Sequence, residues 1–302
     1  MLYLAFRGVD WREIVRTVQG ARVEYLALAL CLVTAASFIR SLRWRVLLSA
    51  EKSLPPVTVF WATMAGYLGN NFLPARAGEV IRTVLIGQAA DLSKSFVLAT
   101  ALTERMMDVV ALVLISLAAL SALQGLPAEL LKAVQVMSAV SLVGLAGLFV
   151  LPRLEGVIEK IARRLPVPET LRVKLVGMVA QFLVGLRALQ HPGRALSFAG
   201  LTSVIWLADA LGSMVIAQAL NLSLALPQAL LLLAALGLAS AAPSTPGYVG
   251  IYQFVAVAVL EPFGFSQSEA LAYVLVAQAM IYVVVLVWGV LGLWRLTARS
   301  RL

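Results

Sequence analysis

Long, largely apolar segments are the feature of this sequence that most restricts its fold. A helix of about 20 apolar residues crosses the hydrocarbon core of a bilayer. Five segments reach or approach that length: Val23–Ile39, Phe96–Leu123, Ala133–Leu151, Leu196–Leu220 and Ala270–Trp294. Of the 302 residues, 61% are hydrophobic and 13% are charged, which is too few charges for the surface of a soluble domain of this size. We therefore expect an all-α polytopic membrane protein, with residues 1–302 forming a single membrane domain.

The net charge of +9 does not indicate a nucleic-acid partner, because the basic residues gather at the ends of the apolar segments. Membrane proteins place such residues on the cytoplasmic side, where they can also attract anionic lipid head groups. One Cys and one His cannot form an intrachain disulfide or a His/Cys metal site. The chain contains neither a P-loop nor a G-x-S-x-G motif. We expect no metal, no cofactor and no enzymatic activity.

Charge at the segment ends predicts the orientation. Arg40, Arg43, Arg45 and Lys52 follow the first span, which places that end in the cytoplasm. The segment 152–194 carries eight basic residues and three acids, and Arg295, Arg299 and Arg301 follow the last span. The sequence therefore predicts a multipass protein of the cytoplasmic (inner) membrane with a cytoplasmic C-terminus. The apolar residues of 152–165 recur at helical spacing, which favours an amphipathic helix on the membrane surface over a solvated linker.

The two remaining apolar stretches, 57–90 and 227–260, each contain a Pro/Gly break between two apolar arms. The predicted orientation requires each stretch to enter and leave on one side, as a hairpin. Pro74-x-x-x-Gly78 then corresponds to Pro246-x-x-x-Gly250. We expect repeat one at about 23–123, a linker span at 133–151 with the segment 152–194, and repeat two at about 195–294. The repeats are inverted and each contains a re-entrant hairpin, a pattern typical of secondary transporters.

The first break, "NNFLPARAGEVIR", combines free backbone groups with charge. Non-helical backbone at membrane depth is tolerated where it is buried in protein or borders a wet cavity. A helix that restarts near Gly78, and another that begins at Pro246, would direct two positive helix N-termini at an anion. Arg76 and Arg82 are the best candidates for phosphate contacts, because the guanidinium group can bind two oxygens.

Several ionisable residues accompany the first break. Glu79 and Arg82 are three residues apart and Glu104 and Asp108 four apart, so each pair shares a helical face. Ionisable residues inside a membrane usually belong to ion pairs, pathways or substrate sites. They could bind substrate, pair with one another to tie the hairpin to its neighbour, or include a proton carrier. The predicted substrate-binding residues are Asn71, Arg76, Glu79, Arg82, Glu104, Arg105 and Asp108.

Three polar residues are weaker candidates for lining a cavity. Asp209 lies in an apolar span, where it could carry a proton or pair with an arginine. Tyr252 and Gln253 follow the second break. For each of the three, a hydrogen bond between helices is the simpler interpretation.

"RWRVLL", "NNFLPARAGEVIR", "TERMMDVVAL" and "PSTPGYVGIYQ" occur in the order typical of one family. From about Leu2 to Trp294 the chain resembles the lysylphosphatidylglycerol synthase transmembrane-region family, also called flippase-like domain proteins. The resemblance implies a multipass inner-membrane protein that moves, or helps to move, an anionic or modified lipid. The family motif maps onto Asn71, Pro74, Arg76, Gly78, Glu79, Arg82, Glu104, Arg105, Asp108, Pro243, Pro246, Gly247 and Gly250.

The chain departs from the family pattern in three respects. The aminoacyl-transferase domain is not expected after Trp294, so synthase activity is not transferred. Tyr252 and Gln253 stand where many members have an Arg-Glu pair. The opening "MLYLAFRGVDW" is similar to the tail of a first spanning helix.

Three functions fit the sequence. The first is translocation of an anionic or modified phospholipid, or of a polyprenyl-linked lipid, by alternating access without ATP. The second is a lipid-binding accessory subunit of a membrane enzyme that modifies lipids or glycans. The third is a lipid-modifying enzyme that uses Glu104 or Asp108, although no nucleophile or metal set accompanies these acids. The expected partners are a membrane lipid with an anionic head group, possible enzyme partners and a possible second copy of the chain.

Overall fold

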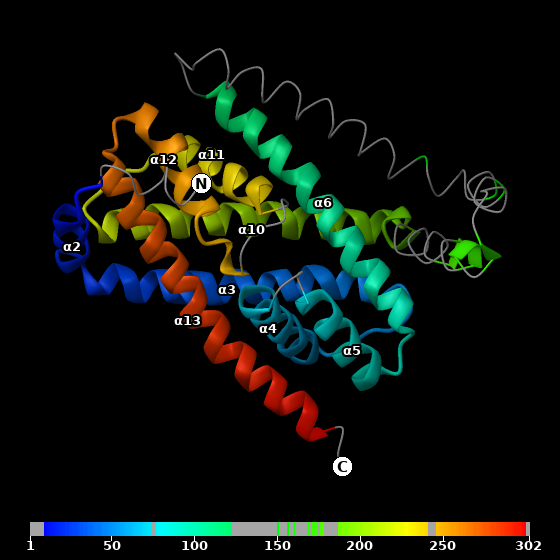
Figure 1. Cartoon of the computed structure of the whole chain (residues 1–302). Coiled ribbons are helices and arrows are strands. Elements are labelled where there is room, and N and C mark those ends of the chain that lie inside the picture. Colours follow the sequence, from blue (N-terminus) through cyan, green and yellow to red (C-terminus); the bar gives the residue numbers. More distant parts are fainter. Residues whose placement is uncertain are drawn as a thin grey trace.

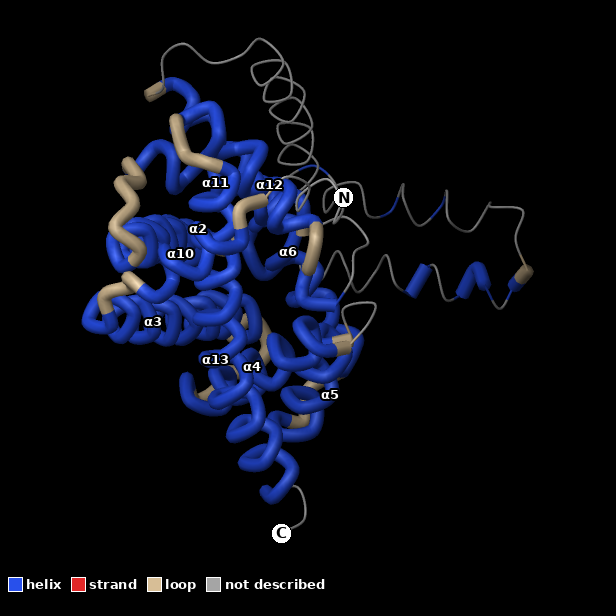
Figure 2. Tube along the Cα trace, turned by 60° about the vertical axis from the view of Figure 1, so that its left-hand side comes forward, coloured by secondary structure: helices blue, strands red, loops and turns tan. Residues whose placement is uncertain are grey.

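The computed structural model describes residues 9–73, 77–122, 187–240 and 246–299, with a few positions between 150 and 177. Every regular element in these ranges is a helix, joined by short connections (Figures 1 and 2). The all-α prediction is confirmed for this part of the chain. The predicted span Ala133–Leu151 and most of the segment 152–194 lie outside the described residues, as do Pro74, Arg76 and Pro243.

Among the described helices, three are long and apolar enough to cross a membrane: α3 (Val23–Leu48), α10 (Pro192–Ala219) and α13 (Gln267–Arg299). They contain three of the five predicted spans. The predicted span Phe96–Leu123 forms α6 (Lys94–Ser121), which has 28 residues but includes the charged side chains of Glu104, Arg105 and Asp108. The chain is a helical membrane protein.

Local sequence signals set several helix starts. Proline fits the first turn of a helix, where its missing N–H removes no hydrogen bond. Pro56 begins α4 (Pro56–Phe72), Pro192 begins α10, and Pro227 lies in the first turn of α11 (Leu226–Ala239). Asp10 caps α2 (Trp11–Gln19), since its carboxylate accepts a 2.9 Å hydrogen bond from the Arg12 backbone N–H.

The helices α3 and α10 lie side by side in opposite directions and form the most extensive helix–helix contact among the described elements (Figure 1). The Arg22 backbone N–H donates to the Ala219 carbonyl at one end, and Arg43 donates to Thr202 Oγ1 toward the other. This pairing brings together the first helices of the two predicted repeats, and α13 crosses both.

Two pairs of short helices occupy the places of the predicted hairpins. α4 packs against α5 (Gly78–Ala90), and α11 packs against α12 (Ile251–Leu260). One buried core surrounds the first pair and includes Trp44, Phe96 and Phe198. A second core surrounds the other pair and includes Ile216, Leu232 and Tyr273. The inverted relation between the two units, and their re-entrant character, remain predictions.

The structure corrects two sequence interpretations of helix boundaries. Arg40 and Arg43 were placed beyond the first span, but α3 continues through both to Leu48 and buries Arg43 to 2% exposure. Pro246 does not begin a half-helix. It starts the 3₁₀ turn η4 (Pro246–Tyr248), and α12 begins only at Ile251, because residues in between have positive φ, which an α-helix excludes. The predicted restart at Gly78 is confirmed.

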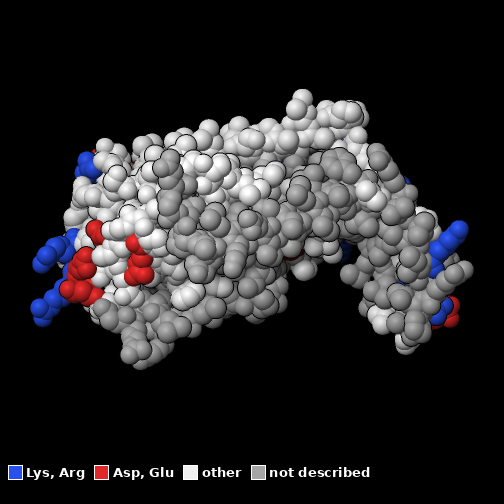
Figure 3. Space-filling view, turned by 90° about the horizontal axis from the view of Figure 1, so that it is seen from above, with Lys and Arg blue, Asp and Glu red and all other residues white. Residues whose placement is uncertain are grey.

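Charged side chains gather at the two ends of the molecule in Figure 3, and the described surface between them on this face is largely uncharged. Large apolar side chains are exposed along the long helices, including Leu114 on α6, Leu207 on α10 and Val287 on α13. Water would disfavour such a surface, whereas hydrocarbon would not. This distribution agrees with helices that run across a bilayer from one charged end to the other.

The α4–α5 contact depends on glycine. A Cβ atom on Gly78 would collide with the Gly66 carbonyl oxygen and lie 2.6 Å from Asn70 Oδ1. A Cβ atom on Gly69 would lie 2.8 Å from the Gly78 Cα atom. The two helices therefore touch backbone to backbone at the first break, which holds the charged residues of α5 close to α4.

We expect Gly78→Ala to destabilise the protein by about 1–3 kcal/mol or more, because the added methyl group must separate α4 from α5. Gly200→Ala is the matched control, since a Cβ atom there meets nothing within 4 Å and alanine favours the helix. The measurement is the thermal unfolding midpoint of each purified variant in detergent. Equal midpoints for the two variants would show that the close contact contributes no stability.

Candidate functional site

A carboxylate shared by two arginines lies at the junction of α3, α5 and α6. Glu104, on α6, is 1% exposed. Its Oε1 atom lies 3.1 Å from Arg43 Nη2 of α3, and its Oε2 atom lies 2.8 Å from Arg82 Nη1 of α5. Both arginines are almost fully buried. Glu104 therefore joins three helices through two charge-assisted hydrogen bonds.

Three further residues complete this group, which we call the charged cluster: Arg43, Glu79, Arg82, Glu104, Arg105 and Asp108. Arg43 Nη1 lies 2.6 Å from Asp108 Oδ1, and Arg82 Nε donates to Glu79 Oε2 at 2.6 Å. Arg105 lies at the outer edge, 3.2 Å from Glu79 and 3.5 Å from Asp108. Three guanidinium groups thus balance three carboxylates, which leaves this buried cluster without net charge.

Aromatic rings cover the cationic side of the cluster. The Arg82 guanidinium lies 4.5 Å from the centre of the Trp44 ring, and that of Arg43 lies 5.1 Å from the Phe198 ring. Trp44 Nε1 in turn donates to Thr100 Oγ1 at 3.1 Å. The two rings stabilise the guanidinium groups through cation–π contacts. They do not satisfy every donor, since Arg43 Nε is buried without a hydrogen-bond partner among the described residues.

The second break is held by neutral groups instead. Gln278 of α13 donates to the Gly247 carbonyl at 3.0 Å, and the Tyr282 hydroxyl donates to the same carbonyl at 2.6 Å. Gln253 donates to Gln278 and accepts from the Gly250 backbone N–H. These bonds satisfy backbone groups that the break frees. Gln278 and Tyr282 were not predicted from the sequence, because both lie on an uninterrupted helix without a break or charge to mark them.

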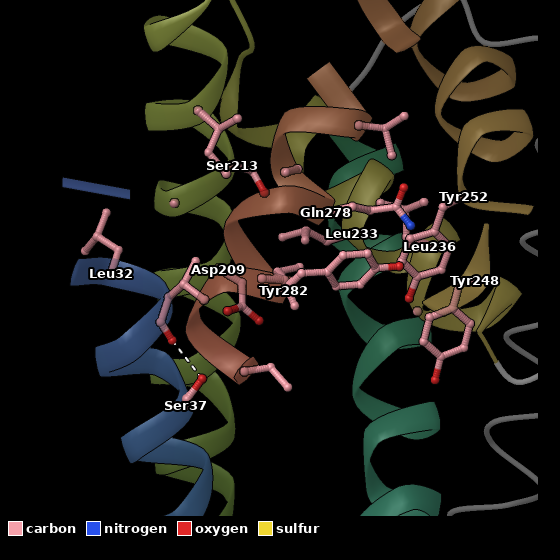
Figure 4. Close-up of a pocket in the computed structure, with 18 of the residues that line it drawn as sticks. Leu32, Ser37, Asp209, Ser213, Leu233, Leu236, Tyr248, Tyr252, Gln278 and Tyr282 are labelled. Carbon is pink, nitrogen blue, oxygen red and sulfur yellow. Dashed lines mark hydrogen bonds between the residues drawn. The ribbon is translucent and has the colours of Figure 1, made fainter. Parts of the chain in front are cut away.

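A cavity of about 310 Å³ lies between α3, α10, α11 and α13 and reaches both breaks (Figure 4). Asn71, at the end of α4, lines it on the side of the first break, and Gly247 and Tyr248 line it on the side of the second. The rest of the wall is mainly apolar and aromatic. A mostly apolar cavity with a few polar groups is typical of a ligand site.

One ion pair lies in the wall of this cavity. Arg40 Nη2 of α3 contacts Asp209 Oδ2 of α10, and the two side chains are 24% and 15% exposed. Figure 4 shows Asp209 on the α10 side of the cavity, with Tyr248 and Tyr252 on the side of η4 and α12. The sequence left open whether Asp209 pairs with an arginine, and the structure shows that it does. Arg40 was missed as a cavity residue because the apolar segment ends just before it.

The predicted substrate-binding residues divide into two groups. Glu79, Arg82, Glu104, Arg105 and Asp108 pair with one another and with Arg43, which matches the alternative that the sequence left open. None of them lines the cavity, whereas Asn71 does. Their role in binding substrate remains a prediction. Arg76 lies outside the described residues.

Of the three weaker candidates, Asp209 and Tyr252 line the cavity. Gln253 is 1% exposed and faces Gln278 instead. Gly250, with φ of 92°, precedes the first residue of α12. In the described part of the chain, no group of three His, Cys, Asp or Glu side chains is placed to hold a metal ion.

Comparison with protein families places the chain beside one that is already described. The model of a family described as "Lysylphosphatidylglycerol synthase TM region" matches residues 1–289. No curated protein and no solved structure matches the chain.

Glu104→Gln is expected to destabilise the protein by about 3–5 kcal/mol, because it leaves Arg43 and Arg82 without their shared buried carboxylate. Arg105→Gln, at the exposed edge of the same cluster, should cost far less. Thermal unfolding in detergent compares the two variants. Similar losses of stability in Glu104→Gln and Arg105→Gln would show that Glu104 does not hold the three helices together.

Proposed function

The chain belongs to the lysylphosphatidylglycerol synthase transmembrane-region family. We propose that it moves a lipid across the cytoplasmic membrane without ATP. The family is that of a membrane domain linked to lipid handling. The lipid head group would cross through the protein interior while its chains remain in the bilayer. The protein would act as a flippase-like transporter and not as an enzyme, with its C-terminus in the cytoplasm.

The cavity that reaches both helix breaks carries this proposal. It places an ion pair, Arg40 and Asp209, in a largely apolar interior between the first helices of the two predicted repeats. Broken helices beside a central site are typical of transporters that work by alternating access. The volume of about 310 Å³ suits a head group and not a whole lipid.

The two breaks support different roles in such a cycle. The charged cluster fixes α5 to α3 and α6 through buried ion pairs, whereas α12 meets α13 through neutral amide hydrogen bonds. A phosphate group would reach Arg82 only after one of its pairs separates, since Glu79 and Glu104 already occupy its nitrogens. We infer that the second helix pair moves more readily than the first.

The alternative function is an accessory subunit that holds a lipid for a separate enzyme. The same cavity would serve such a subunit, because binding a head group does not require its release on the other side. An accessory subunit would retain lipid, co-purify with a partner enzyme and leave the rate of lipid crossing unchanged.

The test is lipid crossing in vesicles that contain the purified protein and fluorescent phospholipids, compared with protein-free vesicles. Ala208→Trp should reduce the crossing rate to nearly that of empty vesicles, because Ala208 lines the cavity and the indole group would fill it. Leu207→Trp is the matched control, since Leu207 is 52% exposed on the outer face of the same helix. Its rate should equal that of the unaltered protein. Absence of any acceleration by the unaltered protein would overturn the proposal.

A further inference from the structure

The charges in the cavity wall are balanced. Arg40 and Asp209 are the only Lys, Arg, Asp or Glu residues among the described residues that line it. They come from different helices and contact each other directly. A ligand that binds either residue through charge must first replace the other as its partner.

A ligand with a single charge would leave one of these residues without a partner. If a phosphate group bound Arg40, the Asp209 carboxylate would remain unpaired in a largely apolar cavity. If an ammonium group bound Asp209, the Arg40 guanidinium would remain unpaired in that cavity. Separating a partly buried ion pair is costly unless both members find new partners. A head group with one phosphate and one ammonium provides a partner for each.

Other groups on the wall match the two halves of such a ligand. The rings of Tyr248 and Tyr252 stack at 4.9 Å with an angle of 9° between their planes, which provides an aromatic surface for an ammonium group. Tyr248 has φ of 61°, a conformation rare for a residue with a side chain, so its position is imposed by its surroundings. Trp206 Nε1 is buried without an acceptor among the described residues and could donate to a phosphate or ester oxygen.

We propose that the cavity binds the head group of a net-neutral, zwitterionic phospholipid, with Arg40 binding the phosphate and Asp209 binding a single ammonium group. The inference names the substrate class of the proposed transporter and so rests on the proposed function. It replaces the sequence expectation of an anionic lipid with a net-neutral one. The Arg40–Asp209 pair separates as the head group enters and forms again as it leaves, so the empty cavity is never left with an unpaired charge.

The test is lipid competition read by native mass spectrometry of the gently purified full chain. Phosphatidylethanolamine, which is zwitterionic, competes against phosphatidylglycerol, which is anionic, with matched acyl chains. We expect the unaltered protein to retain the first over the second by at least about tenfold, because an unpaired, partly buried charge costs more than a tenfold change in affinity. Equal retention, or preference for phosphatidylglycerol, would overturn the proposal.

Two variants test the roles of the residues. Asp209→Asn leaves Arg40 unopposed and should reverse the order in favour of phosphatidylglycerol. Asp209→Glu keeps the charge and should keep the original order, which separates the effect of charge from that of altered packing. An Asp209→Asn variant that still prefers phosphatidylethanolamine would contradict the assignment of Asp209. If that variant does not fold, the order shown by the unaltered protein and by Asp209→Glu decides.

A third lipid tests whether the cavity prefers a head group with only one ammonium group. Lysylphosphatidylglycerol carries a second ammonium group and a net positive charge, and stronger retention of this lipid would overturn the net-neutral assignment. The readout is binding, so it is independent of lipid crossing in vesicles. Retention in the expected order without any crossing would contradict transport but leave the head-group assignment intact.

Discussion

The shared carboxylate of Glu104 is the interaction on which the first half of the structure depends. Its two oxygens contact arginines on α3 and α5, so one residue of α6 fixes the positions of three helices. Removing charges from water is expensive, and the cluster compensates by pairing every guanidinium with a carboxylate and by covering two of them with aromatic rings. The glycine contacts between α4 and α5 then hold the first break against this group.

Around the second helix pair, α11 and α12, buried polar groups are satisfied by neutral hydrogen bonds instead of ion pairs. The break in this helix pair frees backbone groups, and amide and hydroxyl groups of Gln253, Gln278 and Tyr282 satisfy them. Neutral hydrogen bonds separate at lower cost than buried ion pairs that leave charges behind. The left-handed conformations of Gly247, Tyr248 and Gly250 are concentrated in this short stretch. The difference suits a molecule with one fixed half and one half that rearranges.

The cavity is lined by residues from both helix breaks. It lies where the end of α4 meets η4, along the antiparallel α3–α10 contact. Most of its wall is apolar, and its one ion pair leaves no net charge among the described lining residues. Such a wall favours ligands that bring equal and opposite charges, which relates the choice of head group to the same desolvation cost that shapes the charged cluster.

The membrane environment, the all-α class, most helices and the position of the first break could be predicted from the sequence, because apolar runs and Pro/Gly breaks act locally. Helical spacing also placed Glu79 with Arg82 and Glu104 with Asp108 on shared helix faces, but it left open whether these residues pair with one another. The sequence could not assign Arg43 to the charged cluster or Arg40 to the cavity, and it placed the start of the second half-helix wrongly. Those outcomes depend on contacts between distant residues: Arg43 and Glu104 are 61 positions apart, and Arg40 and Asp209 are 169 apart. Only tertiary packing decides which charges meet, because an arginine at the end of an apolar run can equally face water or a carboxylate on another helix.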